Sequence, residues 1–368
     1  MNVYAFIQDY IFMSCVIKNY MSDYIFPTEL IHLIMIYYIH SYRHLLSSGD
    51  DYSFLYQDNI LQSWGSNIYA QLCIDKSIKK TTGTMRHIPN LYMIACGSLH
   101  TVFVSKYVYS VGNNIKGQVG QFINLNITTP ERVKVDGLVL AVGCGSFHTV
   151  IVTDKHVYCM GSNDYKQCGG TVDFYEPTIL DTLSIKNIIN VSCGGFHSFL
   201  MTDNHAYSIG GNRYYQLGLA HNNDINQLEK INLSNIIQIS AGLSHSMFLC
   251  KNGDLYGSGK NSNGQLGLGN FDPCHKLTKV MSNVMMVRTG ESFTIVLTKD
   301  GLYSFGKNSM AQLCLDHYDD CCLPQKINLE KVVSFTCGKN FTIINTRNGL
   351  YGQGANDKKQ LGNCKKIN

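Results

Sequence analysis

The stretch Gly259-Lys-Asn261-Ser-Asn-Gly-Gln265-Leu-Gly267 decides the fold, because its pattern returns along most of the chain. The motif Gly-x-Asn-x-x-x-Gln occurs seven times, and successive motif glycines are 47 to 49 residues apart. A period of this length is typical of a propeller blade or a solenoid unit. The copies contain the glycines Gly65, Gly112, Gly161, Gly210, Gly259, Gly306 and Gly354, the asparagines Asn67, Asn114, Asn163, Asn212, Asn261, Asn308 and Asn356, and the glutamines Gln71, Gln118, Gln167, Gln216, Gln265, Gln312 and Gln360.

A second signature, Cys-Gly-x-x-His, runs in step with the first and marks the start of each unit. It is complete or degenerate in every repeat, and its most divergent copy places Tyr52 where others have histidine. The two signatures together predict a repeat domain over residues 42–368 and a short N-terminal extension over residues 1–41. The copies begin at Ser48-Gly49, Cys96-Gly97, Cys144-Gly145, Cys193-Gly194, Ala241-Gly242, Thr289-Gly290 and Cys337-Gly338.

Short alternating apolar runs separated by turn residues lie between the signatures and predict four β-strands in each unit. Asn252-Gly253 and Asp300-Gly301 are tight-turn pairs, which predict hairpins. A proline is expected at the start of the strand after the variable loop, which makes that strand the outermost one. These prolines are Pro89, Pro130, Pro177, Pro273 and Pro324.

Seven similar units favour closure into a ring over an open solenoid, whose two ends would need caps. The predicted fold is therefore all-β, a seven-bladed β-propeller of four-stranded blades with a short α-helical N-terminal extension. Little sequence follows Gln360 for the outer strand of the last blade. Residues 365–368, or a strand from the N-terminal extension, are expected to fill that place.

The repeated residues are interpreted as architecture, because a functional site on a propeller uses positions that differ between units. Glycine supplies a special backbone angle, asparagine closes a turn, and glutamine is expected to bond the backbone of a neighbouring blade. The histidines at 100, 148, 197 and 245 can meet on a metal ion only if they lie almost on the axis, so we predict structural roles for them. No metal or cofactor site is predicted.

The cysteines of the second signature share one register and are expected to be buried free thiols, as are Cys73 and Cys314, which replace a glycine of other repeats. Cys321 and Cys322 are interpreted as adjacent loop thiols. No nucleophile elbow, phosphate loop, carboxylate pair or zinc-protease motif occurs, so we predict no catalytic residues and no enzyme activity.

Composition limits the partners and the compartment. The net charge of +4 is spread along the chain without a basic run, so nucleic acid is not expected as a partner. Polar residues interrupt the N-terminal apolar stretches, which predicts neither a signal peptide nor a membrane span, and an intracellular protein. The abundance of Ile, Asn, Lys and Tyr is typical of an AT-rich genome, such as that of a protist or a giant virus.

The motif Gly-x-Asn-x-x-x-Gln-Leu-Gly, clearest from Gly259 to Gly267, together with Cys-Gly-x-x-His, resembles the regulator-of-chromosome-condensation repeat. The resemblance implies a seven-bladed propeller but several possible roles, because members serve as Ran exchange factors, ubiquitin-ligase modules, scaffolds and a photoreceptor. The photoreceptor role requires clustered tryptophans, and Trp64 is the sole tryptophan. The even spacing leaves no repeat with room for the protruding hairpin of the exchange factor.

The N-terminal extension contains a segment, residues 26–38, that resembles the first helix of an F-box. Pro27 suits the first turn of a helix, and Leu30, Ile34 and Tyr37 recur at helical spacing. The segment is shorter than a complete F-box. One interpretation is therefore a helix that packs on the propeller, and the other is a helix that docks a Skp-like adaptor of a ubiquitin ligase.

The sequence thus predicts a non-enzymatic protein-interaction scaffold whose unequal loops after each glutamine bind a protein partner. Two alternatives stay open at this point. One is a guanine-nucleotide exchange factor for a Ran-like small GTPase, and the other is an F-box-type substrate receptor of a ubiquitin ligase.

Overall fold

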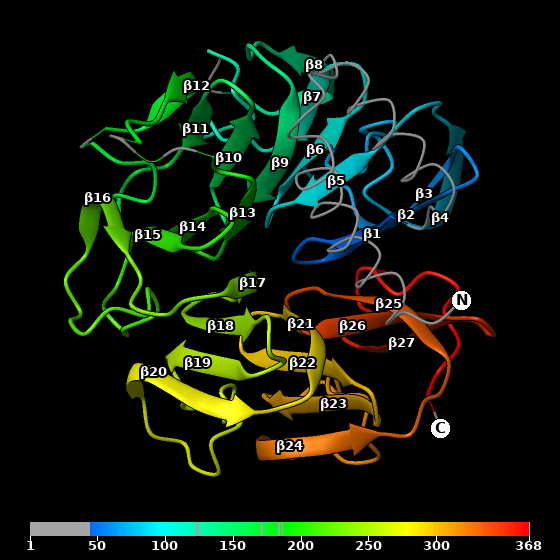
Figure 1. The fold of residues 1–368 in the computed structure, drawn as a ribbon. Coiled ribbons are helices and arrows are strands. Elements are labelled where there is room, and N and C mark those ends of the chain that lie inside the picture. Colours follow the sequence, from blue (N-terminus) through cyan, green and yellow to red (C-terminus); the bar gives the residue numbers. More distant parts are fainter. Residues whose placement is uncertain (1–44, 123–124, 171, 183–184, 186, 368) are drawn as a thin grey trace, which may run out of the picture.

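A computed structural model describes residues 45–122, 125–170, 172–182, 185 and 187–367, and these residues form seven small antiparallel sheets around one axis (Figure 1). The predicted all-β, seven-bladed propeller is confirmed. No helix occurs among the described residues, so none there could cross a membrane. The extension at residues 1–41, with its predicted helix, lies outside the described residues.

The strands follow one another in chain order within every blade. They are β1 Leu45–Ser48, β2 Tyr52–Gln57, β3 Ile60–Ser66, β4 Lys80–His87, β5 Met93–Cys96, β6 His100–Val104, β7 Val108–Gly112, β8 Ile127–Val133, β9 Val139–Cys144, β10 His148–Thr153, β11 Val157–Gly161, β12 Phe174–Ile179, β13 Asn190–Cys193, β14 His197–Met201, β15 Ala206–Gly210, β16 Ile225–Lys230, β17 Ile236–Ala241, β18 His245–Cys250, β19 Leu255–Gly259, β20 Cys274–Met281, β21 Val284–Thr289, β22 Phe293–Thr298, β23 Gly301–Gly306, β24 Cys321–Ile327, β25 Val332–Cys337, β26 Phe341–Thr346 and β27 Gly349–Gly354.

The first strand of each blade lies innermost, because these strands contact one another around the axis from β1 through β25 and back to β1 (Figure 1). The fourth strand lies outermost. Pro273 directly precedes β20, as predicted, whereas Pro130, Pro177 and Pro324 lie in the middle of fourth strands and not at their start. An outermost strand tolerates proline there because one of its edges forms no ladder. The prediction for Pro89 was wrong, because this residue follows β4 instead of starting it.

Burial explains why the second strand of a blade is apolar at nearly every position. β10 is buried along its whole length because neighbouring blades cover both of its faces. The outer strand β16, Ile-Asn-Gln-Leu-Glu-Lys, has no buried residue, and its four exposed residues are all polar. A strand buried on both faces shows a continuous apolar run, whereas an outer strand does not.

The hydrophobic core consists of seven clusters, one at each junction between neighbouring blades. The cluster between blade 7 and blade 1 is the smallest, and its buried members are Phe341, Ile343 and Leu361, with Leu46 of blade 1 packed against them. The chain therefore joins its first and last blades with less apolar contact than any other pair.

Blade 7 is also incomplete among the described residues. Its sheet has three strands, β25 to β27, and Lys365 adds a single parallel bridge to Tyr351. Residue 365 thus takes part of the place of the fourth strand, as the sequence suggested. A cavity of about 180 Å³, lined in part by Trp64 and Leu350, remains at the junction with blade 1.

Candidate functional site

The motif glycines provide a backbone conformation that other residues rarely adopt. All seven have φ between +104° and +119°. At Gly161 a Cβ atom would lie 2.3 Å from the carbonyl oxygen of Phe147, so the position has neither the conformation nor the space for a side chain. Each motif glycine lies at or next to the end of a third strand and pairs with the residue that begins the second, as Gly161 does with His148.

The motif asparagines close the turn that follows. In every copy, the side-chain Oδ1 accepts a hydrogen bond from the backbone N–H five residues later, at 2.9 to 3.1 Å. In Asn212, Nδ2 also donates to the carbonyl of His221 at 2.6 Å, so one side chain shapes both the turn and the base of the variable loop. The seven asparagines that make this bond are Asn67, Asn114, Asn163, Asn212, Asn261, Asn308 and Asn356.

The motif glutamines act differently from the expectation, which was a side-chain bond to the backbone of a neighbouring blade. Their Oε1 atoms accept a bond from the N–H two residues earlier, at 2.9 to 3.0 Å, within the same loop. The predicted partner was therefore wrong for every copy. The seven residues are Gln71, Gln118, Gln167, Gln216, Gln265, Gln312 and Gln360.

The amide nitrogens of these glutamines do not supply the expected backbone bond either. Nε2 of Gln312 does reach the next blade, but it donates to the side chain of Asn340, at 3.3 Å. In Gln71, Gln167 and Gln360, Nε2 is buried without a hydrogen-bond partner among the described residues. The group that crosses the junction is the glutamine carbonyl, which accepts a bond from a hydroxyl of the next blade.

The histidines complete the same junctions. His100, His148, His197 and His245 are fully buried, and each Nε2 lies 2.8 to 3.2 Å from the hydroxyl of Thr149, Ser198, Ser246 or Thr294 in the next blade. The Thr149 hydroxyl already donates its proton to the Gln118 carbonyl, at 2.8 Å, so His100 must donate from Nε2. In all four histidines Nδ1 is buried without a hydrogen-bond partner among the described residues, and burial lowers the pKa of each ring to about 3, so the rings are neutral at neutral pH.

This arrangement gives the histidines an architectural task. Each ring packs over the glycine of its own turn, where a Cβ on Gly145 would lie 2.1 Å from Cε1 of His148. Among the described residues no group of three or more His, Cys, Asp or Glu side chains could hold a metal ion. Tyr52, Phe293 and Phe341 fill the corresponding positions of blades 1, 6 and 7.

The cysteines of the second signature are free thiols, as predicted, but they are only partly buried. Cys321 and Cys322 are also free, but the prediction of a loop was wrong for them, because they begin β24. Cys73 and Cys314 have φ of 57° and 59°, the left-handed conformation that glycine adopts at this position in other repeats.

The sequence did not reveal the disulfide between Cys159 and Cys168 in blade 3. The sequence signal for this disulfide is a double substitution. The other units have serine or glycine in place of Cys159, and leucine or valine in place of Cys168. In blade 2, for example, the hydroxyl of Ser110 donates to the carbonyl of Val119 at 2.6 Å. The disulfide thus joins two segments that a hydrogen bond joins elsewhere.

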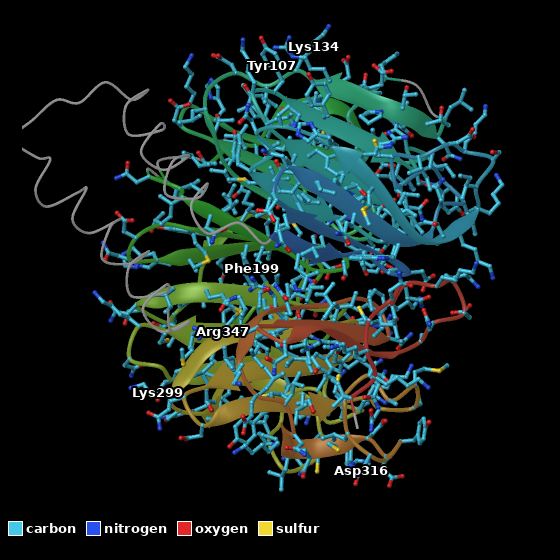
Figure 2. All side chains as sticks on the ribbon, turned by 90° about the vertical axis from the view of Figure 1, so that its right-hand side faces the viewer. Tyr107, Lys134, Phe199, Lys299, Asp316 and Arg347 are labelled. Atoms are coloured by element: carbon cyan, nitrogen blue, oxygen red, sulfur yellow. A yellow bond between two sulfur atoms is a disulfide. The ribbon has the colours of Figure 1, made fainter. Side chains whose placement is uncertain are left out.

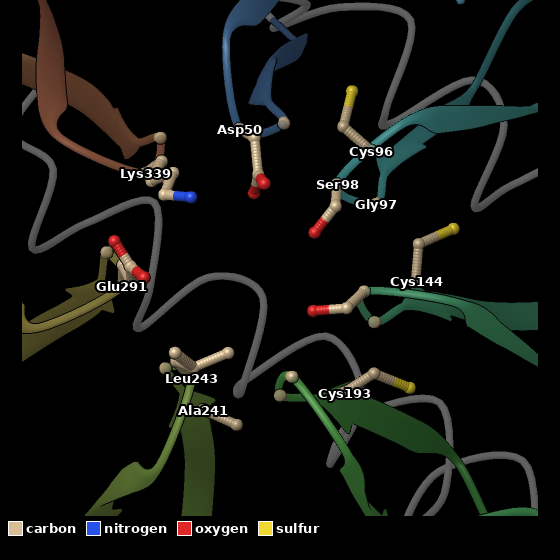
Figure 3. Close-up of a pocket in the computed structure, with 18 of the residues that line it drawn as sticks. Asp50, Cys96, Gly97, Ser98, Cys144, Cys193, Ala241, Leu243, Glu291 and Lys339 are labelled. Carbon is tan, nitrogen blue, oxygen red and sulfur yellow. The ribbon is translucent and has the colours of Figure 1, made fainter. Parts of the chain in front are cut away.

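The turns between first and second strands surround an axial cavity of about 490 Å³. We call the end of the propeller that carries these turns and the Gly-to-Gln segments the loop face, and the opposite end the hairpin face. One residue of each blade, directly after the repeated glycine, is placed nearest the axis (Figure 3). These seven residues are Asp50, Ser98, Ser146, Gly195, Leu243, Glu291 and Lys339.

Main-chain hydrogen bonds from six of these residues, two of them to the carbonyls of Gly145 and Gly242, link neighbouring blades around the axis. Six of the junctions carry an N–H to carbonyl bond of 3.1 to 3.3 Å from one blade to the next. The bond from Lys339 N–H to the Asp50 carbonyl, at 3.2 Å, closes the ring between the last and first blades. At the junction of blades 1 and 2, the Tyr52 hydroxyl donates to the Gly97 carbonyl at 3.0 Å.

The charges of the cavity lie on one side of it. Asp50, Glu291 and Lys339 project toward the axis from blades 1, 6 and 7, whereas the cysteine sulfurs of blades 2 to 4 point away (Figure 3). Within the described part of the chain no ion pair joins Lys339 to either carboxylate. Burial raises the pKa of Asp50 to about 6, against the opposing effects of Lys339 and a hydrogen bond with Ser98.

These charges lie outside the repeated positions, so the repeat signatures do not reveal them. The signal was the residue after the repeated glycine, which is charged in only three units, and these units become neighbours once the ring closes. The predicted partner-helix residues, Pro27, Leu30, Ile34 and Tyr37, lie outside the described residues. The F-box-like interpretation of that segment stays a prediction.

The chain belongs to the regulator of chromosome condensation (RCC1) repeat family. The profile of this repeat matches residues 107–152, 154–201, 203–249, 252–297 and 299–344, which is more than half of the chain. A second profile of the same repeat matches residues 139–167, 188–216 and 236–265. The matched repeats run from the third strand of blade 2 to the second strand of blade 7.

Curated relatives share parts of this propeller. The secretion-regulating guanine nucleotide exchange factor of Bos taurus is 38% identical over 132 residues, which cover 32% of this chain and 28% of that protein. The probable E3 ubiquitin-protein ligase HERC6 of Homo sapiens is 31% identical over 97 residues, or 24% of this chain and 9% of that protein. The match thus spans less than a third of either relative.

Solved structures agree with the fold. Human WBSCR16 superposes with a TM-score of 0.75 at 21% identity, covering 83% of this chain and 91% of that chain. Prp20p from Saccharomyces cerevisiae, whose binding to Gsp1p and histones has been studied, gives a TM-score of 0.72 at 19% identity, covering 86% and 83%. At these identities the likeness establishes the fold alone.

We predict that Gly161→Ala lowers the free energy of unfolding by about 2 kcal/mol or more, because the new Cβ meets the Phe147 carbonyl and φ is +110°. Gly170→Ala is the matched control, since its φ is +71° and its nearest neighbouring atom would lie 3.6 Å away. Urea denaturation of both variants measures the difference. Equal losses would show that the close contact does not limit this position.

We predict that His197→Phe folds, because phenylalanine already fills this position in blades 6 and 7, whereas His197→Ala loses about 3 kcal/mol of unfolding free energy through the cavity it leaves.

The pH dependence of stability should also differ between His197 and phenylalanine. The unfolded histidine binds a proton below about pH 6.5 and the folded one only near pH 3, so stability falls as pH drops through this window. The phenylalanine variant should lose this contribution, about 1.4 kcal/mol per pH unit. Denaturation curves from pH 6 to 4 measure it, and parallel curves would contradict it.

We predict that Asp50→Asn stabilises the propeller at pH 7.5 by about 3 kcal/mol, because burial raises the carboxyl pKa from 3.8 to about 6. Between these values the folded state binds the extra proton, so the native carboxyl costs stability as pH rises through 4 to 6. Asp51, Glu291 and Lys339 are present in both proteins. The gain should vanish below pH 4, and a gain that persists there would contradict its electrostatic origin.

Proposed function

We propose that this chain is a non-enzymatic protein-interaction propeller that binds its partner through the loop face. Of the seventeen large apolar side chains exposed in the described part of the chain, eleven lie in segments that join a third strand to a fourth. A protein exposes grouped apolar side chains chiefly where it binds another surface. The eleven are Ile68, Ile78, Ile115, Phe122, Leu125, Tyr165, Val172, Tyr214, Phe271, Met310 and Tyr318.

The two ends of the blades differ in chemistry. Lys299, in a second-to-third strand hairpin, and Asp316, in a third-to-fourth strand segment, lie at opposite ends of blade 6 when the propeller is seen edge-on (Figure 2). The hairpin face presents mainly polar residues such as Asp154, Lys155 and Lys251, all exposed. The unequal, partly apolar loops of the other face are therefore the better candidate for partner recognition.

The aromatic and aliphatic residues sit on rigid supports. Ile115, Tyr165 and Tyr214 lie within Gly-to-Gln turns that the asparagine and glutamine side chains hold. A side chain on a preorganised turn loses little conformational freedom when a partner covers it, which favours binding. The segments after each glutamine differ in length and sequence, and they would supply the specificity.

A second candidate function is guanine-nucleotide exchange on a Ran-like small GTPase. The observation that favours it is the 38% identity to the secretion-regulating exchange factor of Bos taurus over 132 residues. Exchange would also proceed through a protein interface, without a catalytic side chain for covalent chemistry. The ubiquitin-ligase alternative depends on residues 26–38, which the structure does not describe.

We expect that Ile115→Asp combined with Tyr214→Ser abolishes the capture of specific partners by the full chain, because both changes place polar groups on the loop face. Ile60→Asp combined with Ile189→Asp is the control, since these exposed residues lie at the opposite end of the blades. Affinity capture with quantitative mass spectrometry compares the three proteins. A partner retained by the loop-face variant but lost from the control would overturn the assignment.

Exchange activity predicts that catalytic amounts of the full chain accelerate the release of a fluorescent guanine nucleotide from a Ran-like GTPase. The loop-face variant should abolish the acceleration and the hairpin-face control should retain it. Stopped-flow fluorescence follows the release. An unchanged release rate with the native chain excludes exchange on that GTPase and leaves the interaction proposal in place.

A further inference from the structure

The axial cavity has an unusual balance of hydrogen-bonding groups. At six of the seven junctions, a backbone N–H at the rim of the cavity already donates a hydrogen bond to a carbonyl of a neighbouring blade. The side chains that remain are the carboxylates of Asp50 and Glu291, the hydroxyls of Ser98 and Ser146, and the ammonium group of Lys339. Acceptors therefore exceed donors, and a ligand rich in donors would complement the cavity.

The charges around the cavity also favour a cationic, donor-rich ligand. The negative charges of Asp51 and Glu291 act on Asp50, and among the described residues the cation that opposes them is Lys339. Arg288 does not line the cavity, and its guanidinium donates to the Val287 carbonyl at 3.2 Å. The mouth is therefore negative on balance, with a carboxylate on each side of Lys339 (Figure 3).

The position of the cavity decides the kind of ligand. It opens at the centre of the loop face, so a protein bound to the exposed apolar side chains would lie across its mouth. The walls near Leu243 and Gly195 are uncharged and leave room for an aliphatic stem beside the carboxylates. A long side chain with a cationic end has this shape, because its methylene groups contact apolar surface while its head makes the polar contacts.

We propose that the axial cavity receives an arginine or lysine side chain of the protein partner, with Asp50 and Glu291 binding its cationic group. This inference rests on the proposed function, since it names what the partner inserts at the loop face. Lys339 repels a cationic group and so limits its affinity, but the two carboxylates outweigh this single positive charge. The cavity thus selects the partner by charge, while the surrounding apolar residues supply contact area.

The test uses Nα-acetyl-arginine methylamide as the probe, with the citrulline counterpart as its uncharged match, titrated into the full chain by calorimetry. We expect saturable binding of the arginine probe and none of the citrulline probe. Asp50→Asn and Glu291→Gln should each weaken binding by roughly tenfold, whereas Lys339→Met should strengthen it by a similar factor. Asp272→Asn, an exposed loop residue on the same face, is the control and should change nothing.

The opposite directions separate a charge effect from damage to the fold. Equal binding of both probes, or stronger binding by Asp50→Asn and weaker binding by Lys339→Met, overturns the proposal. Acetate, titrated in the same way, tests for an anion site and should not bind. A partner whose capture depends on Ile115 and Tyr214 but is unaffected by Asp50→Asn with Glu291→Gln would leave the interaction face in place and refute the cavity assignment.

Discussion

The propeller depends on one contact repeated at the junctions between blades. A hydroxyl that follows the histidine position donates to the carbonyl of the motif glutamine in the preceding blade, and six described junctions carry this bond, at 2.7 to 3.2 Å. Because the hydroxyl proton has a single destination, it also fixes the tautomer of each histidine that meets it. The hydroxyl oxygen on the second strand therefore links its own blade to the glutamine turn of the preceding blade and to the histidine ring that it meets.

The repeats made the fold predictable because each local signal has a single structural solution. Gly161 must be glycine at its backbone angle, and Asn163 closes its turn with the same hydrogen bond that the equivalent asparagine makes in every other unit. The crossing role of glutamine was assigned to the wrong group, since a residue type does not reveal whether its side chain or its carbonyl makes the bond. The Cys159–Cys168 pair and the three cavity charges were missed because they depend on contacts between positions that vary among units.

The junction between the last and first blades departs from the others in a consistent way. It has the smallest apolar cluster, a three-stranded last blade and a cavity beside Trp64. Polar contacts remain there, including the bond from Lys339 to the Asp50 carbonyl and that from Ser53 to the Gln360 carbonyl. Two of the three cavity charges, Asp50 and Lys339, flank this same junction.

The ring around the axis assigns blade cohesion to main-chain atoms and ligand recognition to side chains. At six of the seven junctions these residues hold the blades together through main-chain atoms, which do not depend on the side chain, and all but Gly195 present a side chain to the cavity. Exchanging one of these side chains would change what the cavity recognises while the closing bonds stay in place. At Gly195 a Cβ would lie 2.9 Å from the Leu243 carbonyl oxygen, so this position must stay glycine. The architecture therefore offers the other six positions as places where new specificity can evolve with little penalty to folding.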